Sequence, residues 1–160
     1  MIQRVQTVYM LASVIAVLSM HFFWLASFAT PEATFSLTSL GLQCSTPGFE
    51  TDLMAWDLFL LLLVMLALPL VTIFLYRKRK LQLHLLIYTA VLDLCYYALY
   101  FYDADKYATQ VLAKIDSNVL DVSHNIMMLA MPGLSIFCLI MAMRGVIYDI
   151  ALLKSLDRLR

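Results

Sequence analysis

The residue of this sequence best suited to chemistry is an aspartate in the middle of an apolar stretch. Asp93 is the only charged residue between positions 81 and 102. An ionisable side chain inside a membrane span is costly, so it faces the interior of the helix bundle and is a candidate functional residue. Tyr97 and Tyr100 follow it four and seven residues later, which places the three side chains on one helix face. A carboxylate beside tyrosine hydroxyls can carry a proton, bind a ligand or form a hydrogen-bonded structural node.

Two further polar residues are candidates for the same node. From a rise of about 1.5 Å per residue, His21 and Asp57 fall in the same half of the bilayer as Asp93, the half away from the chain termini. His21 can donate a hydrogen bond to the aspartate. The sequence therefore predicts an intramembrane polar node formed by Asp93, His21, Asp57, Tyr97 and Tyr100. We expect this node to be structural rather than a transport path, because one buried acid is thin support for transport.

The sequence carries none of the usual motifs of soluble enzymes. HExxH, GxSxG, GxGxxG and the phosphate-binding loop are all missing. The histidines at positions 21, 84 and 124 lie at depths that do not converge on a metal site. The three cysteines include no CxxC pair. The sequence thus predicts no catalytic residue, no metal and no cofactor.

Apolar segments long enough to cross a membrane position these residues. The 160-residue chain is 63% hydrophobic and 14% charged with no net charge, whereas soluble domains average roughly 45–50% apolar and 25% charged residues. A balanced charge of this kind does not predict nucleic-acid binding. Runs of about 20 apolar residues predict transmembrane helices at about residues 8–28, 53–76, 81–102 and 124–147. We expect a single domain over residues 1–160, an all-α antiparallel four-helix transmembrane bundle.

The positions of the basic residues predict the orientation of the bundle. Lys and Arg near the ends of spans are retained in the cytoplasm. Nine of the eleven basic residues lie on the side that holds both termini: Arg4, Arg77, Lys78, Arg79, Lys80, Arg144, Lys154, Arg158 and Arg160. Both termini are therefore expected in the cytoplasm. We interpret the turn formed by Arg77, Lys78, Arg79 and Lys80 as a topogenic signal, and contact with anionic headgroups is the alternative.

The two outer loops, residues 29–52 and 103–123, contain patterns typical of short strands. Residues 34–40 alternate apolar and polar side chains before Gly41, which we interpret as a breaker. The second loop predicts a hairpin with strands at residues 111–115 and 119–122. We expect these strands to pair as a small extracytoplasmic β cap. The alternative is that the second loop extends the fourth helix outward from about residue 107.

Residues 148–160 form an amphipathic tail on the cytoplasmic side. Apolar residues recur there at helical spacing with charged residues between them. We expect the tail to continue the fourth helix and to contact the membrane interface or a partner. The residues of this predicted contact are Leu153, Leu156, Leu159, Arg158 and Arg160.

Three segments of the chain resemble a known family. Residues 1–9 (MIQRVQTVY), 74–82 (FLYRKRKLQ) and 155–160 (SLDRLR) are similar to an uncharacterised family of four-span membrane proteins from Bacteroidetes, a domain of unknown function. This resemblance implies a location in the bacterial inner membrane and implies no activity.

We therefore expect a non-enzymatic accessory or structural subunit of a larger inner-membrane assembly. It would contact membrane lipids and other membrane-protein subunits. A small oligomeric transporter or channel that uses Asp93 is the alternative, and an enzyme acting on lipid ranks third.

Overall fold

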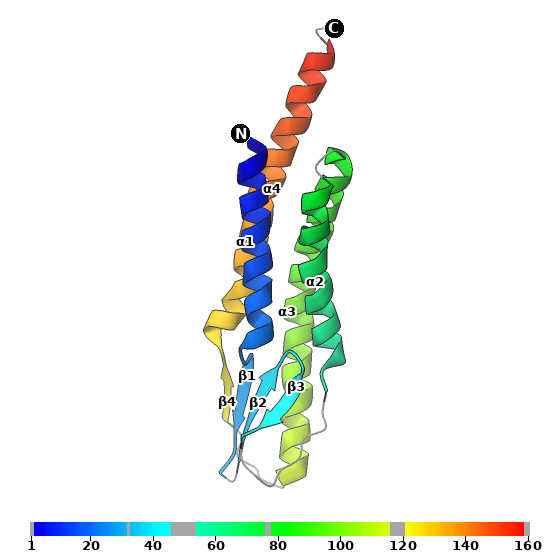
Figure 1. Ribbon diagram of the computed structural model, residues 1–160. Coiled ribbons are helices and arrows are strands. Elements are labelled where there is room, and N and C mark those ends of the chain that lie inside the picture. The colour runs from blue at the N-terminus through cyan, green and yellow to red at the C-terminus, as the bar shows by residue number, and fades with distance from the viewer. Residues whose placement is uncertain (1, 32, 46–53, 76–77, 116–120, 159–160) are drawn as a thin grey trace.

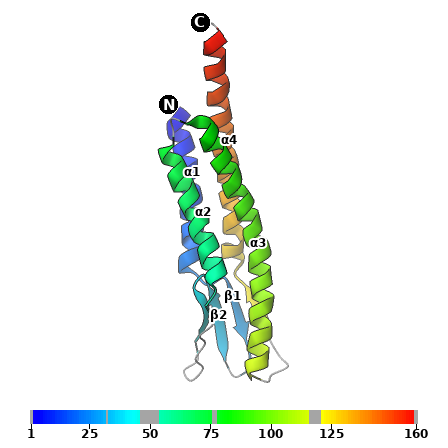
Figure 2. The same cartoon turned by 90° about the vertical axis from the view of Figure 1, so that its right-hand side faces the viewer.

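The computed structural model describes residues 2–31, 33–45, 54–75, 78–115 and 121–158. Within these residues, four helices are long and apolar enough to cross a membrane: α1 (Ile2–Phe22), α2 (Trp56–Phe74), α3 (Arg79–Ile115) and α4 (Ile126–Arg158). Helix α1 packs on α2 and α4, and α3 packs on the same two helices. The result is an antiparallel four-helix bundle with both termini at one end and a small sheet at the other (Figures 1 and 2). We call these the termini end and the sheet end.

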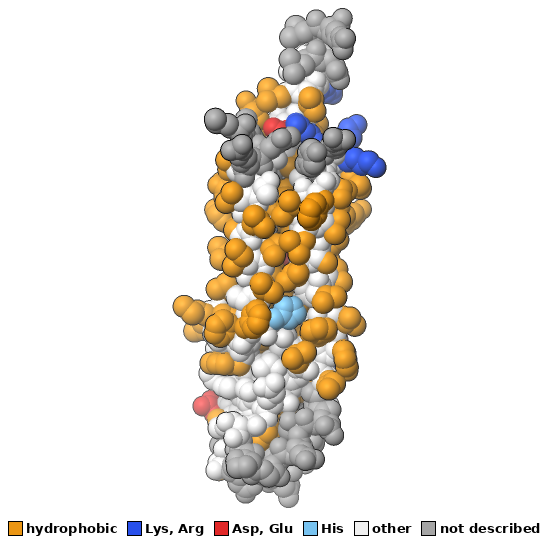
Figure 3. All heavy atoms as spheres, in the orientation of Figure 1, with side chains coloured by type: hydrophobic (Ala, Val, Ile, Leu, Met, Phe, Trp, Pro, Cys, Tyr) orange, Lys and Arg blue, Asp and Glu red, His pale blue; other side chains and the backbone are white. Residues whose placement is uncertain are grey.

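The helices of the bundle expose many large apolar side chains. Large hydrophobic side chains such as Val8, Ile15, Leu60 and Val91 are exposed on the outer faces of the helices. Figure 3 shows that apolar side chains cover the middle of one face, while its Lys and Arg side chains gather near the termini end. A helix that is hydrophobic all round suits a lipid environment. The predicted helical class is confirmed in this form, and the surface indicates a multi-pass membrane protein.

The first predicted span is too long at its C-terminal end. We expected the helix to reach residue 28, but α1 ends at Phe22 and strand β1 occupies Ala26–Ala29. Ala26 and Phe28 are fully buried in this strand, which pairs with a strand on each side. Two ladders of backbone hydrogen bonds replace the helical ones, so the apolar composition of these residues does not require a helix.

The small sheet at the sheet end is partly the predicted cap. In the described residues its strand order is β3-β2-β1-β4 with antiparallel pairing throughout. Strand β2 (Thr34–Thr38) confirms the alternating pattern, and β4 (Asp121–His124) overlaps the second strand of the predicted hairpin. Gly41 does not end the sheet, because β3 (Gly41–Cys44) begins there with Gly41 at a φ of 139°. This left-handed backbone suits glycine and lets the hairpin turn.

The predicted hairpin strand at residues 111–115 is wrong. These residues are helical, because α3 runs past the predicted end of the third span to Ile115. Tyr100, Ala104, Tyr107 and Val111 are buried at helical spacing along this extension, and α3 contacts β1. A helical periodicity of buried side chains over twelve residues is a stronger signal than a strand-like pattern over five residues. The alternative prediction was also wrong, because this extension belongs to α3 and not to α4.

The prediction that the tail continues the fourth helix is confirmed. α4 continues without interruption from Ile126 to Arg158, well beyond the predicted end of the span at residue 147. Figure 1 shows its C-terminal part reaching past the ends of the other three helices.

Candidate functional site

Asp93 lies inside the bundle, on the face of α3 that packs against the other helices. Its side chain is fully buried. Neither carboxylate oxygen has a hydrogen-bond partner of standard geometry among the described residues. Ser135 of α4 lies beside it, close enough to act on the carboxylate. A buried carboxylate without a paired cation is expensive and marks a candidate functional residue.

Two serines extend this site across the bundle. The hydroxyl oxygens of Ser13 on α1 and Ser135 on α4 are 2.8 Å apart, and both side chains are fully buried. Together with Asp93 on α3, they bring polar groups from three helices to one place, and we call these three residues the central polar site. Interhelical hydrogen bonds of this kind stabilise membrane helix packing by about 1 kcal/mol each. Neither serine was among the predicted site residues.

The two predicted tyrosines do not donate to Asp93. The Tyr97 hydroxyl donates to the Leu129 carbonyl at 2.9 Å. Gly133 leaves room for this contact, since a Cβ atom there would lie 3.3 Å from the Tyr97 hydroxyl oxygen. The Tyr100 hydroxyl lies 2.8 Å from His124 Nδ1 and 3.3 Å from the Leu25 carbonyl. Both tyrosines therefore tie α3 to neighbouring segments.

The other two predicted members of the node lie in different surroundings. The His21 ring makes an edge-to-face contact with Phe59 of α2, with centroids 5.7 Å apart. Asp57, in the first turn of α2, accepts a hydrogen bond from the Leu58 backbone at 3.1 Å. It also lies beside Asp103 of α3. No described hydrogen bond joins Asp93 to any of the other four predicted residues. Its described neighbour is the Ser135 hydroxyl of α4, which contacts Ser13 of α1.

Asp103 is a second buried acid that the sequence analysis placed in an outer loop. The extension of α3 carries it into the sheet end, where its side chain is fully buried. Its nearest described cation is Lys106, whose Nζ lies 3.9 Å from Asp103 Oδ1. Tyr107 on the next turn donates to the Met54 carbonyl at 3.3 Å. The helical spacing of the buried residues around Asp103 is the signal that would have placed it correctly.

A third buried acid, Asp149 of α4, is well paired at the termini end. Gln6 of α1 donates to its Oδ2 at 3.1 Å, and Arg79 of α3 lies 3.3 Å from the same oxygen. Gly145, one turn earlier on α4, leaves room for Gln6, because a Cβ atom there would lie 2.6 Å from Gln6 Cγ. None of these three contacts was predicted from the sequence, although a glycine one turn before an acid is a visible signal. We call Gln6, Arg79 and Asp149 the ion-pair site.

The predicted basic turn and tail are described in part. Lys78 precedes α3 and Arg79 begins it. Leu153 is exposed on α4, and Leu156 and Arg158 belong to the same helix, with their side chains outside what the structure describes. Arg77, Leu159 and Arg160 lie outside the described residues.

The central polar site can bind a proton on Asp93 or stabilise the packing of the helices. No hydrogen bond among the described residues joins Asp93 to Asp103, to Asp149 or to the surface. Within the same residues, no group of three or more His, Cys, Asp or Glu side chains is placed to hold a metal ion. The arrangement therefore resembles an internal packing node more than a pathway for protons.

Comparison with known proteins gives a family. A family model described as Domain of unknown function (DUF4293) matches residues 2–159, nearly the whole chain. No curated protein and no solved structure matches. The match agrees with the resemblance seen in the three sequence segments, and its description names no activity.

Proposed function

The chain belongs to the DUF4293 family, which is defined by a domain of unknown function, and on that premise we propose that it is a non-enzymatic accessory or structural subunit of a larger bacterial inner-membrane assembly. The observation that carries this proposal is the projecting end of α4. The helix has 33 residues and is therefore about 50 Å long, compared with a hydrocarbon core of about 30 Å.

The projecting segment is exposed on all sides. Every residue from 151 to 155 is exposed, including Leu152 and Leu153. A short helical segment that packs on nothing is only marginally stable in water. It gains stability when its apolar face packs against a partner. Figures 1 and 2 show that this segment extends past the ends of the other three helices. A neighbouring membrane-protein subunit is the partner that we propose.

The orientation is part of the proposal. We place both termini in the cytoplasm of a bacterium of the Bacteroidetes type, since basic residues gather at the termini end. The projecting segment of α4 would then meet its partner at the cytoplasmic surface of the inner membrane.

A second candidate function rests on Asp93. A buried carboxylate without a described partner is the feature that a small proton-coupled transporter or channel would need. We rank it second because the surrounding hydroxyls and tyrosines bond to helix backbones and to each other.

Purification from native membranes through a tag placed after Arg160 tests the proposed function. We expect a stoichiometric membrane-protein partner by mass spectrometry, and the tag should resist protease added outside spheroplasts. Leu152→Glu should release the partner and leave the chain in the membrane, because insertion is decided by the spans. Ser155→Glu, which adds the same charge without removing an apolar contact, is the matched control and should keep the partner.

Two results would contradict the proposal. Recovery of the wild-type chain with no stoichiometric partner would exclude the subunit function. Digestion of the tag by external protease would reverse the orientation.

A further inference from the structure

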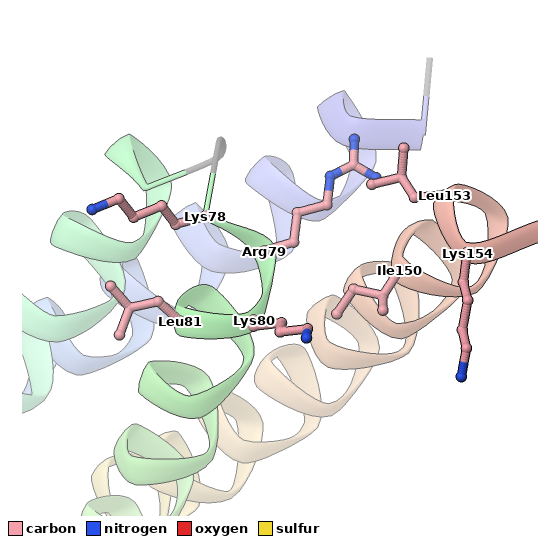
Figure 4. Close-up of a pocket in the computed structure, with 7 residues that line it drawn as sticks. All are labelled: Lys78, Arg79, Lys80, Leu81, Ile150, Leu153 and Lys154. Atoms are coloured by element: carbon pink, nitrogen blue, oxygen red, sulfur yellow. The ribbon is translucent and has the colours of Figure 1, made fainter. Parts of the chain in front are cut away.

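A groove opens at the termini end between the start of α3 and the projecting part of α4. It has a volume of about 780 Å³. Figure 4 shows its two walls: Lys78, Arg79, Lys80 and Leu81 come from the start of α3 and the residue before it, and Ile150, Leu153 and Lys154 come from α4. We propose that this groove binds the headgroup of an anionic phospholipid.

The charge of the groove fits a phosphodiester. Four of its seven lining residues are cationic. Arg79 is shared with Asp149 at 3.3 Å, whereas Lys78, Lys80 and Lys154 have no described acidic partner within salt-bridge distance. Lysine and arginine donate strong charge-assisted hydrogen bonds to phosphate oxygens. Arg79 is also held in place by its ion pair, so a headgroup meets a partly preorganised site.

The backbone adds to this attraction. α3 begins at Arg79, and the first N–H groups of a helix have no partner within the helix. The Gln82 N–H donates to the Lys78 carbonyl at 2.9 Å, so the unpaired groups belong to the residues directly after Lys78. A helix N-terminus of this kind favours an anion.

The apolar part of the groove favours a lipid over a soluble anion. Leu81, Ile150 and Leu153 line it beside the cations. Leu81 is exposed on α3, and Phe74, the last residue of α2, is the most exposed of the described large hydrophobic side chains at this end of the hairpin. The basic residues therefore lie where the apolar surface of the bundle ends, which is the depth of lipid headgroups. Basic pockets between helices at this depth are suited to anionic headgroups.

The test compares lipid retention by the purified full chain in native mass spectrometry. With equal amounts of phosphatidylglycerol and phosphatidylethanolamine, we expect the wild type to retain phosphatidylglycerol. In the variant Lys78→Gln/Lys80→Gln/Lys154→Gln the preference should fall about fivefold per lysine removed. The triple variant keeps Arg79, so the ion-pair site is preserved. Arg144→Gln is the matched control, because Arg144 is exposed on α4 and does not line the groove.

The outcomes separate the possible occupants. Equal retention of both lipids by the wild type, or an unchanged preference in the triple variant, would overturn the proposal. An effect of Arg144→Gln as large as that of a Lys154→Gln single variant would also overturn it, because it would indicate a diffuse charge effect. Displacement of phosphatidylglycerol by excess glycerol phosphate would assign the groove to a soluble phosphate. Loss of a co-purifying acidic protein with unchanged lipid preference would assign it to a protein partner. The Leu152 variant does not alter this groove, so this test is independent of the proposed subunit function.

Discussion

Two buried aspartates in the same bundle have opposite surroundings. Asp149, at the termini end, receives a hydrogen bond from Gln6 and an ion pair from Arg79. Asp93, in the middle of the bundle, has only the hydroxyl of Ser135 beside it and no described partner of standard geometry. Both carboxylates face the interior, so burial alone does not distinguish a structural acid from a functional one.

The difference lies in what each acid would leave behind if it were removed. Loss of Asp149 leaves a cation and an amide that were arranged around it, and an uncompensated buried charge is strongly destabilising. Loss of the Asp93 charge leaves two serine hydroxyls that already contact each other. The ion-pair site should therefore be sensitive to substitution, and the central polar site should tolerate it.

The largest effect is expected for Asp149→Leu. The substitution should lower the free energy of unfolding by about 2 kcal/mol, which is less than for a fully buried pair because Arg79 keeps some contact with solvent. Titration with SDS in mixed micelles, followed by circular dichroism, measures this change. The double variant Asp149→Leu/Arg79→Leu should recover part of the loss. A single variant as stable as the wild type would show that the ion pair does not hold the helices.

A smaller effect is expected at the two glycines that flank the same two regions. A Cβ atom at Gly145 would lie 2.6 Å from Gln6 Cγ, so Gly145→Ala must displace Gln6 from Asp149. We expect a loss of about 1 kcal/mol by the same titration, as for a tight contact in a packed core. Gly133→Ala meets only the Tyr97 hydroxyl at 3.3 Å and is the matched control with a smaller loss. A larger loss of stability in Gly133→Ala than in Gly145→Ala would contradict this prediction.

The sequence predicts which residues are buried better than it predicts their partners. Asp93 could be placed inside the bundle because a charged residue in a span must avoid lipid. Its neighbour Ser135 could not be predicted, since serine is tolerated on any face of a helix. The rotation of α1 and α4 about their axes is set by packing across the whole bundle. Asp149 was missed as a buried residue because it lies near the end of a span, where an acid can also reach water.

The fold shows the same limit. The helices follow from apolar runs of about 20 residues, whereas the ends of α1 and α3 depend on contacts with the sheet. The chain can leave α1 at Phe22 and continue as β1 because β2 and β4 supply hydrogen bonds to the β1 backbone. β2 is the next strand in the chain and its alternating pattern is visible in the sequence, but β4 comes from more than ninety residues later and no local pattern joins it to β1.

The smallest effect on stability, and the sharpest functional test, is expected for Asp93→Asn. Asparagine keeps the size of the side chain and can accept a hydrogen bond from Ser135, and no described cation loses its partner. The free energy of unfolding should therefore change by less than about 1 kcal/mol. Because the amide cannot carry a proton, the variant also separates the two functions. In vesicles with an imposed pH gradient, a subunit should show the same low proton leak in the wild type and in Asp93→Asn. A proton flux in the wild type that is lost in a folded Asp93→Asn, and kept in Asp149→Asn, would instead establish the central polar site as a transport site.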